Sequence, residues 1–487
     1  MTEISDQGQQ SIYITTTLPY VNARPHIGHA LEFVQADVYA RVKRLQGCEV
    51  FFNTGTDEHG QKIKQKATDS NHDPKTYVDH YATEFQTLLK QFNISNDAFI
   101  RTTSDNHMLA AQAMWERCNE ASDIYKKQFT GLYCVGCELF LTERDLVDGN
   151  CPDHNQPPQE IMTENYFFKF SNYSQPLLDL LSDPNTIIPD HHRQWAINFV
   201  REGLDDFSIS RRRDQLDWGI PVPGDDDHVM YVWFDALTNY ISTLGWPSAE
   251  SDGLFEEFWN NGHTIQFAGK DQVRMQSLMW QAMLMSAGEQ PTTQIFYHGF
   301  ITSEGQKMSK SIGNVIDPFE IINDYGTDFL RTFLLRHIHP VDDSDVTKDK
   351  LANAYNADFV NGIGNLVSRI LTMAENYDVE YGVQDIDDVL NSEDADQFFN
   401  LISEFAFNEA LDWLWAEFAA LDEYIASEEP FKTIKTNEVK AKADVAYCAI
   451  RLHELAVLLQ VITPDTADKI TSAIEKRTKP DNLFPRK

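Results

Sequence analysis

Two histidines at the start of an expected helix have the residue types and spacing of a candidate anion site. His26 and His29 lie three residues apart, so they share one face of a helical turn, and Gly28 stands between them. The first turn of a helix presents N–H groups without intrahelical partners and a partial positive charge. The imidazoles add donors, and the glycine leaves the backbone open to a ligand. The pattern predicts an anion site suited to a triphosphate. Two surface histidines at an ordinary helix cap are the alternative.

A second basic segment lies far along the chain, in the run GQKMSKS. Lys307 and Lys310 stand there with two serine hydroxyls on an expected loop. Lysines on a loop can close over a pyrophosphate leaving group and stabilise the charge that grows in the transition state. The segment therefore predicts polyphosphate binding, with a solvated surface loop as the alternative.

Three cysteines and a histidine are spaced as metal ligands. The pairs are Cys134 with Cys137 and Cys151 with His154, each with two residues between its members. Two chelating turns of this kind suit tetrahedral zinc, and buried thiols without metal are the alternative. Because all four positions are filled by protein, we expect a structural zinc rather than a catalytic one.

The elements around the histidine pair read as a strand, a turn and a helix. Residues 12–17 are mostly β-branched or aromatic and predict a buried strand, after which Pro19, Asn22 and Pro25 predict a turn. Apolar residues then recur every three or four positions from Ile27 to Leu45, which predicts an amphipathic helix. A second strand is expected at 50–52. Asp57 follows that strand where ligands bind in open parallel sheets, so it is a candidate cation binder.

The rest of the chain predicts an α/β protein with a helical end. The strand pattern resumes at 230–233, 265–267 and 295–297, and helical spacing dominates from Leu351. We expect a Rossmann-like, doubly wound parallel sheet that is split by a zinc-binding insertion and followed by an all-α bundle. The expected parts are 1–122 for the first half of the sheet domain, 123–205 for the insertion, 206–300 for the second half, 301–350 for the linker with the lysine loop and 351–487 for the bundle.

Composition limits the partners and the compartment. The chain has 487 residues, 42% of them hydrophobic, and a formal net charge of −35. Such acidity opposes broad binding to nucleic acid, so any RNA contact must rest on local basic patches and unpaired bases. Neither a signal segment nor a membrane-spanning run is evident, and six cysteines are too few for a disulfide scaffold. We expect a cytoplasmic protein without a membrane partner.

The motifs together carry a resemblance. HIGH at 26–29 with KMSKS at 307–311 resembles the class I aminoacyl-tRNA synthetases. The segments TTLPYVNARPHIGHA, TGTDEHG, YVWFDALTNY, FAGKD and KMSKSIGNVIDP, in this order, resemble the bacterial methionyl-tRNA synthetase family with one zinc knuckle. The resemblance implies ATP-dependent ligation of L-methionine to tRNA(Met), including the initiator, through a methionyl adenylate. AMP and pyrophosphate would be released.

The resemblance also assigns residues and partners. ATP, with Mg²⁺, would be bound by His26, Gly28, His29, Gly269, Asp271, Lys307 and Lys310. L-Methionine would be bound by Leu18, Tyr20, Asp57, Trp233, Ala236, Tyr240 and Gln276. The tRNA anticodon would be bound by Asn365, Arg369 and Phe431, which all belong to the expected bundle. A monomer is expected, because no appended domain follows the bundle.

Two positions depart from the family pattern, and two rivals stay open. Gln276 stands where many members have histidine near the substrate side chain, and Phe431 where tryptophan is usual. A class I synthetase for another amino acid is one rival, although the insertion of roughly 80 residues is short for an editing domain. A non-catalytic RNA-binding protein with the same fold is the other.

Overall fold

The chain divides into two compact units, each described by itself. The computed structural model describes residues 10–136, 139–152, 155–248, 253–308, 314–480 and 482–486. The first unit, here called the sheet unit, comprises 1–24, 47–87 and 95–298. The second, the helical unit, comprises 25–46, 88–94 and 299–487.

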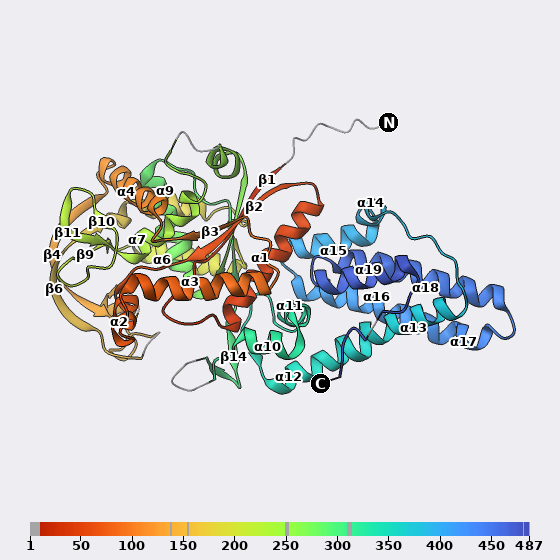
Figure 1. Ribbon diagram of the computed structural model, residues 1–487. Helices are drawn as coiled ribbons and strands as arrows, with labels where there is room; N and C mark the ends of the chain where they lie inside the picture. Colours follow the sequence, from red (N-terminus) through yellow and green to blue (C-terminus); the bar gives the residue numbers. More distant parts are fainter. Residues whose placement is uncertain are drawn as a thin grey trace, which may run out of the picture. The chain divides into compact units, whose positions relative to one another are not determined.

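A six-stranded parallel sheet forms the centre of the sheet unit. Its strand order is β3-β2-β1-β12-β13-β7. Figure 1 labels β1, β2 and β3 of this sheet. The strands are β1 Ser11–Thr16, β2 Glu49–Thr56, β3 Ala98–Arg101, β7 Ile187–Ile188, β12 His263–Gly269 and β13 Gln294–His298. Ile14 lies in register between Phe52 on β2 and Ile265 on β12. All three residues are buried and have a high propensity for β-strands. The predicted parallel sheet and its strands near 12–17, 50–52, 265–267 and 295–297 are confirmed.

The strand order reverses at β1. The chain runs from β1 to β2 and β3 on one side, and β12 and β13 lie on the other. At such a switch point the loops after neighbouring strands part and leave a crevice at the carboxyl ends. The segments after β1, β2 and β12 are therefore the place where this sheet would bind a ligand.

Helices pack over the sheet around one apolar core. Tyr13 and Ile295 from the sheet join Trp115 of α4 and Trp280 of α9 in a single buried cluster. The helices between 61 and 287 are α2 Gln61–Asp69, α3 Pro74–Gln91, α4 Asp105–Glu120, α5 Ser174–Leu180, α6 Asp190–Glu202, α7 Val232–Leu237, α8 Asn239–Ser242 and α9 Trp280–Ala287. Single turns or π-helical stretches are η1 Glu143–Asp145, η2 Phe170–Tyr173, η3 Phe255–Asn260, η4 Lys270–Gln272 and η5 Met275–Met279. This core supports the central sheet below the segments that follow its strands.

The expected insertion, 123–205, contains three strands of a separate antiparallel sheet with the order β5-β4-β6-β8, and the fourth strand, β8, lies just after it. These strands are β4 Ile124–Cys134, β5 Leu139–Leu141, β6 Gln159–Phe168 and β8 Phe207–Ser208. The later part of the insertion returns to the central sheet, because Ile187 and Ile188 pair with Ile295 and Phe296. Residues 123–205 thus supply three strands of an appended sheet and one edge strand of the main sheet.

The predicted strand at 230–233 is wrong. β11 Asp225–Met230 ends there, in a small antiparallel sheet with β9 Ser210–Arg212 and β10 Pro221–Val222. Tyr231 is extended and caps α7, so Val232 and Trp233 are helical. A short apolar run does not distinguish a strand from a buried helix, and here the following residues complete a buried helical turn.

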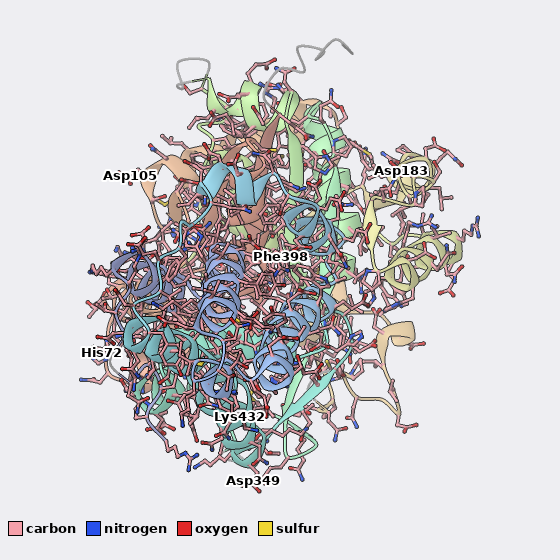
Figure 2. All side chains as sticks on the ribbon, turned by 90° about the vertical axis from the view of Figure 1, so that its right-hand side faces the viewer. His72, Asp105, Asp183, Asp349, Phe398 and Lys432 are labelled. Atoms are coloured by element: carbon pink, nitrogen blue, oxygen red, sulfur yellow. The ribbon has the colours of Figure 1, made fainter. Side chains whose placement is uncertain are left out.

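The helical unit confirms the predicted all-α end of the chain. Figure 1 shows α16, α18 and α19 lying side by side. In this unit Phe398 is fully buried, whereas Lys432 is exposed (Figure 2). The helices are α1 Ile27–Leu45, α10 Pro318–Tyr325, α11 Thr327–Arg336, α12 Lys348–Ala354, η6 Tyr355–Ile363, α13 Gly364–Asn376, α14 Ile386–Leu390, α15 Glu393–Ser403, α16 Phe407–Glu428, α17 Pro430–Thr433, α18 Glu438–Leu459 and α19 Pro464–Lys476. A small sheet of β14 Ile301–Ser303, β15 Gln306–Lys307 and β16 Ser344–Val346 lies at the start of this unit's long segment. Within the described ranges, no helix is both long and apolar enough to span a bilayer.

A buried arginine fastens α1 to the rest of the helical unit. Arg331 on α11 is 0% exposed, and its Nη2 donates to Asp37 Oδ2 on α1 at 2.7 Å. The same guanidinium donates to the carbonyls of Val461 and Ile462, at 3.1 and 2.6 Å, in the turn between α18 and α19. A buried cation is tolerated only when its N–H groups are paired in this way. The helix that begins with the histidine pair is therefore tied to the bundle.

Candidate active site

The two histidines cap the helix that they begin. His26 is the N-cap of α1, and its ring stacks on that of His29 with centroids 3.7 Å apart. The His26 backbone N–H donates to His29 Nδ1, and the Gly28 N–H donates to His26 Nδ1, each at 3.2 Å. An imidazole whose Nδ1 accepts carries its proton on Nε2 when neutral. The cap therefore fixes both rings as Nε2–H donors.

The backbone N–H groups of this turn are already used, which corrects the expected way of binding an anion. Besides the Gly28 N–H, the Ile27 N–H donates to Ile316 O at 3.1 Å, and the His29 N–H to His26 O at 3.0 Å. An anion at this turn would meet imidazole Nε2–H groups instead of backbone. The need for glycine at position 28 also differs from the one expected. A Cβ there would lie 3.0 Å from His26 Cε1 and Nδ1. The glycine makes room for the folded histidine ring.

The lysine segment follows a tight hairpin in the same unit. β14 and β15 are joined through Glu304 and Gly305, both with positive φ, and the Gly305 N–H donates to Asp345 Oδ1 at 2.6 Å. The backbone of Lys307 belongs to β15, whereas Lys310 lies outside the described residues. The bond from Ile27 to Ile316 brings the chain just after this segment against the first turn of α1. The helical unit thus holds both parts of the predicted polyphosphate site.

Asp57 and Tyr20 meet beyond the ends of β1 and β2. They form a parallel bridge in which the Asp57 N–H donates to Pro19 O at 2.9 Å and the Val21 N–H to Asp57 O at 3.1 Å. Asp57 is only 5% exposed. The residue lies just beyond the carboxyl end of β2, next to β1 where the strand order reverses, and a carboxylate there would attract a ligand ammonium.

The other residues predicted to bind methionine lie on neighbouring segments of the sheet unit. Tyr20 and Trp233 pack against one small cluster that includes Tyr231 and Val232. Leu18, Ala236 and Tyr240 are buried at 7%, 6% and 2% exposure, in the turn after β1 and on α7 and α8. The structure brings Tyr20 and Trp233 together and places Ala236 and Tyr240 on consecutive short helices.

Gln276 is part of a buried amide network. Its Nε2 donates to Gln266 Oε1 on β12 at 3.1 Å, and its carbonyl accepts from Gln281 Nε2 at 2.9 Å. The Thr292 hydroxyl also donates to Gln266 Oε1, at 3.3 Å. A histidine at 276 would have to replace only the side-chain bond to Gln266, because the bond from Gln281 goes to the backbone carbonyl.

Gly269 is the last residue of β12, and Asp271 lies two residues beyond it. A Cβ at Gly269 would lie 2.7 Å from Asp271 Oδ1, so the glycine is needed for the carboxylate to fold back over the strand end. Carboxylates at this end of a sheet can accept from sugar hydroxyls. The pair is placed where such a contact with a nucleotide could form.

A buried histidine and aspartate cluster was not predicted. Asp235 on α7 is fully buried, with His59 Nδ1 at 2.7 Å from Oδ2 and His107 Nε2 at 2.9 Å from Oδ1. His107 Nδ1 lies 2.9 Å from the Ser242 hydroxyl on α8. Burial alone would raise the pKa of Asp235, but the adjacent His59 charge and the hydrogen bond from His107 outweigh it and lower the pKa. The only sequence signal was the position of His59 two residues after Asp57.

Arg211 is a second buried charge that the sequence did not reveal. Its guanidinium lies over the ring of Tyr231 at 4.5 Å and over Phe140 at 5.0 Å, and Nη1 donates to Ser210 O at 2.8 Å. Tyr231 belongs to the small cluster beside Tyr20 and Trp233. The cation is therefore held by aromatic faces next to the predicted pocket.

Two of the four predicted zinc ligands can be placed. Cys134 ends β4, and Cys151 lies in the turn before β6; both are buried in the small cluster with Tyr231. Cys137 and His154 lie outside the described residues. Among the residues that are described, no three histidine, cysteine or acidic side chains form a metal-binding group. The thiols of two separate turns in one cluster fit two corners of a zinc site.

The predicted anticodon residues lie on two helices of the helical unit. Asn365 is exposed on α13, and Arg369, one turn later, is paired with Asp422 of α16. Phe431 on α17 is 42% exposed, with Lys432 Nζ 5.9 Å from its ring centre. A partly exposed ring beside a cation can accept a stacked base.

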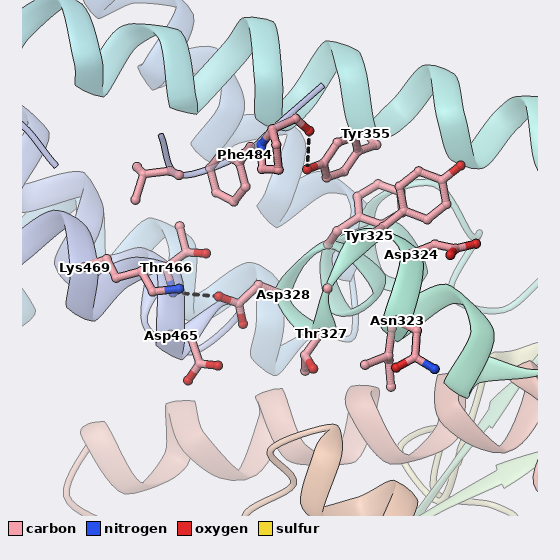
Figure 3. Close-up of a pocket in the computed structure, with 15 residues that line it drawn as sticks. Asn323, Asp324, Tyr325, Thr327, Asp328, Tyr355, Asp465, Thr466, Lys469 and Phe484 are labelled. Carbon is pink, nitrogen blue, oxygen red and sulfur yellow. Dashed lines mark hydrogen bonds between the residues drawn. The ribbon is translucent and has the colours of Figure 1, made fainter. Parts of the chain in front are cut away.

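A pocket in the helical unit contains none of the predicted residues. It has a volume of about 320 Å³ and lies between the α10–α11 junction, the start of α19 and residues 483–485. Asp328 Oδ2 accepts from the Thr466 N–H at 2.6 Å, and the Tyr355 hydroxyl donates to Pro485 O at 3.0 Å. Figure 3 shows Asp328, Thr466 and Tyr355 along this pocket. These bonds fasten the helix ends to one another, so the pocket is a packing feature of this unit.

Known proteins match almost the whole chain. The family model described as tRNA synthetases class I (M) matches residues 12–160 and 154–371. The methionine–tRNA ligase of Rhizobium meliloti is 39% identical over 95% of this chain and 91% of its own length. That of Fusobacterium nucleatum is 36% identical over 96% of this chain and 74% of its own. The Mycobacterium tuberculosis methionyl-tRNA synthetase in complex with methionyl-adenylate superposes with a TM-score of 0.87, at 34% identity, over 98% of both chains.

Proposed function

We propose how the site residues divide the work, on the premise that the chain belongs to the class I tRNA synthetases that act with methionine. Its activity is the ATP-dependent ligation of L-methionine to tRNA(Met) through methionyl adenylate, with release of AMP and pyrophosphate. The observation that carries this conclusion is agreement over nearly full length in both sequence and fold with enzymes of that one activity. The individual roles below rest on the geometry of each residue.

In the first step, we assign the triphosphate to the imidazoles and the lysine segment. A methionine carboxylate oxygen forms a bond to the α-phosphorus of ATP as the bond to the β-phosphate oxygen breaks. The Nε2–H groups of His26 and His29 would donate to the phosphate oxygens, and Lys307 and Lys310 would stabilise the departing pyrophosphate with the Mg²⁺ that accompanies ATP. The acceptor roles of both Nδ1 atoms support this, because they leave the proton on the outward nitrogen. Gly28 makes room for that ring arrangement.

The substrate carboxylate must be held in line with the α-phosphate. Asp57 would pair with the ammonium group of methionine, which fixes the end of the substrate that reacts. Gly269 and Asp271 would lie along the ATP ribose, with the carboxylate accepting from a hydroxyl. The place of all three after β2 and β12, at the switch point of the sheet, supports these roles.

The methionine side chain needs an apolar pocket with some freedom of fit. Leu18, Tyr20, Trp233, Ala236 and Tyr240 would surround the thioether with aliphatic and aromatic surface, which polarisable sulfur favours. Gln276 would lie near this pocket within its amide network. The burial of Leu18, Ala236 and Tyr240, with Tyr20 and Trp233 partly buried beside them, supports a pocket from which most water is excluded.

In the second step, a hydroxyl at the 3′ end of the tRNA attacks the carbonyl carbon of the adenylate, and AMP leaves. Asn365 and Arg369 would bond to anticodon base edges, and Phe431 would stack on a base. Initiator tRNA would be read in the same way. The exposure of Asn365 and Phe431 supports direct contact with RNA. We further assign this chain to the cytoplasm, as a monomer.

A structural zinc would be held by Cys134, Cys137, Cys151 and His154. The two buried thiols that the structure describes have the donor chemistry of such a site and lie in one cluster. When bound, zinc supplies a cross-link between the two turns. The small cluster with Tyr20 and Trp233 would then rest on a fixed knuckle.

The activity is tested by amino-acid-dependent exchange of pyrophosphate into ATP. Each standard amino acid is offered to the purified protein with ATP and labelled pyrophosphate. We expect methionine to support exchange and the others to support little. Exchange with leucine, isoleucine, valine or cysteine at the methionine level would favour another class I synthetase. No exchange with any amino acid, methionine included, would favour a non-catalytic RNA-binding protein.

A further inference from the structure

A buried network in the sheet unit touches three segments of the proposed methionine site. Asp235 is 0% exposed, and each of its carboxylate oxygens has one imidazole partner, His59 on Oδ2 and His107 on Oδ1. His59 and His107 are themselves only 4% and 0% exposed. None of these three side chains has a role in the two reaction steps above, so the network needs its own explanation.

The network begins beside the ammonium site. His59 follows Asp57 by two residues in the loop after β2. The intervening Glu58 is also fixed, because it accepts from Arg101 Nε at 2.6 Å and its carbonyl accepts from Trp218 Nε1 at 2.6 Å. The loop that carries Asp57 is therefore anchored on both sides of its short length.

The network ends on the two helices of the thioether pocket. Asp235 stands between Trp233 and Ala236 on α7, which has only six residues. His107 bonds through Nε2 to Asp235 and through Nδ1 to Ser242 on α8, the helix that carries Tyr240. One imidazole thus spans the two helices. Short helices gain little stability from their own hydrogen bonds, so such tertiary contacts decide their position.

The chemistry of the cluster makes its geometry stiff. A carboxylate removed from water must be paired on both oxygens, and loss of either partner leaves a buried charge without compensation. Hydrogen bonds to a charged acceptor are also stronger than neutral ones. The distance from the loop of Asp57 to the helices of Trp233 and Tyr240 is consequently set by bonds that resist change.

We propose that His59, Asp235 and His107 are positioning residues that fix the spacing between the ammonium site at Asp57 and the thioether pocket on α7 and α8. This inference rests on the proposed roles of Asp57, Trp233 and Tyr240. Methionine is recognised at both ends, so a change in this spacing weakens its binding and its discrimination from analogues. ATP is bound elsewhere in the proposal, so its KM is independent of the cluster.

The experiment compares conservative and truncating substitutions in pyrophosphate exchange. His59→Asn retains an N–H donor near the position of Nδ1, and His107→Gln retains one near the position of Nε2. His59→Ala and His107→Ala remove those donors, and Asp235→Asn removes the charge. His72→Ala is the control, because His72 is an exposed histidine of the same unit (Figure 2). Each protein is assayed for KM of methionine, KM of ATP and the preference for methionine over norleucine, in which a methylene replaces sulfur.

We expect the alanine variants and Asp235→Asn to raise the KM of methionine about tenfold or more, with the KM of ATP within about twofold of the parent. Preference over norleucine should fall several-fold. The asparagine and glutamine variants should recover most of the lost affinity, and His72→Ala should match the parent. If Asp235→Asn does not fold, the His59 pair of variants gives the same comparison at the end of the network.

Two results would overturn the proposal: equal rises in both KM values, or conservative variants no better than alanine. Either would mean that the cluster only stabilises the fold. Failure of the proposed function has a separate signature, because the parent protein would then show no methionine-dependent exchange. Failure of the Asp57 assignment would appear as Asp57→Ala with an unchanged KM of methionine.

Discussion

Two pairs of histidines in the protein differ in burial and in the partners of their ring nitrogens. His26 and His29 are half-buried at the start of α1, and their Nδ1 atoms accept from backbone N–H groups. His59 and His107 are buried in the sheet unit and share the carboxylate of Asp235. The first set is arranged by four consecutive residues, and the second by contacts across 176 and 128 positions of sequence.

The difference separates a reacting group from a supporting one. A ring that is fixed through Nδ1 by its own backbone keeps Nε2–H in a defined direction, which suits a donor to phosphate. A ring bonded to a buried carboxylate is held within the fold and suits the placement of other groups. Substitutions in the two sets should therefore change different kinetic constants.

The largest effect is expected at His29, where two substitutions divide its two nitrogen roles. His29→Asn keeps an acceptor near Nδ1 for the His26 N–H but loses the distal donor, so the rate of exchange should fall about 100-fold to 1,000-fold with little loss of stability. His29→Gln keeps both roles, because a glutamine at this third helical position can accept from the His26 N–H and its amide also carries an N–H donor, so it should retain more activity at an unchanged free energy of unfolding. Exchange kinetics and urea unfolding measure the two quantities. Equal activity in both variants would contradict the assigned donor.

Gly28→Ala should give the next largest effect. The new Cβ would lie 3.0 Å from the His26 ring and displace it, so exchange should slow roughly tenfold to a hundredfold. Alanine has the higher helix propensity, by up to about 1 kcal/mol, so the stability of the protein should be kept. Activity and thermal unfolding are measured together. Full activity would show that the stacked rings are not the reacting arrangement.

Acid should reveal the charge within the buried set. Because the pKa of Asp235 is lowered in the folded protein, this carboxylate takes up a proton first in the unfolded chain as the pH falls. The stability that the carboxylate contributes is therefore present above about pH 4 and is lost as the pH falls through the lower pKa of the folded state. Asp235→Asn lacks that contribution. Urea unfolding should show it less stable than the parent by about 1 to 3 kcal/mol at neutral pH, with a gap that narrows in acid. A gap that widens in acid would contradict the ionised state.

The smallest effect lies outside both sets, at Phe431 in the helical unit. Phe431→Trp enlarges the stacking surface beside Lys432, so kcat/KM for tRNA charging should rise a few-fold. A rise of this size corresponds to a fraction of the free energy of one base–aromatic stacking contact. Pyrophosphate exchange without tRNA should not change. Charging assays with tRNA(Met) measure the first and exchange the second. A change in exchange would show that this residue acts on the adenylation site.

The motif histidines and the sheet could be predicted because their signals are local. Spacing predicted α1, and β-branched runs predicted the buried strands, whereas the zinc knuckle read from the cysteine pairs stays a prediction. The segment at 230–233 was predicted as a strand, because a short apolar run is the same in a strand and in a buried helix. The first turn of α1 was predicted with open N–H groups, because spacing does not show that Ile316 and the imidazole of His26 occupy them.

The supporting cluster could not be predicted from the same kind of signal. His59, His107 and Asp235 lie on separate elements, and only the folded sheet unit brings them together. A buried carboxylate leaves no periodicity, and Asp235 sits in an apolar run that suggests plain core packing. Long-range polar contacts of this kind need the tertiary structure.

Equilibrium binding of methionine without ATP tests the division between the two sets most directly. Tryptophan fluorescence, with Trp233 in the proposed pocket, would report the dissociation constant of the parent, His29→Asn and Asp235→Asn. The account predicts that His29→Asn binds methionine as the parent does, although it exchanges pyrophosphate slowly, and that Asp235→Asn binds methionine about tenfold or more weakly. Weak binding in His29→Asn with normal binding in Asp235→Asn would contradict it.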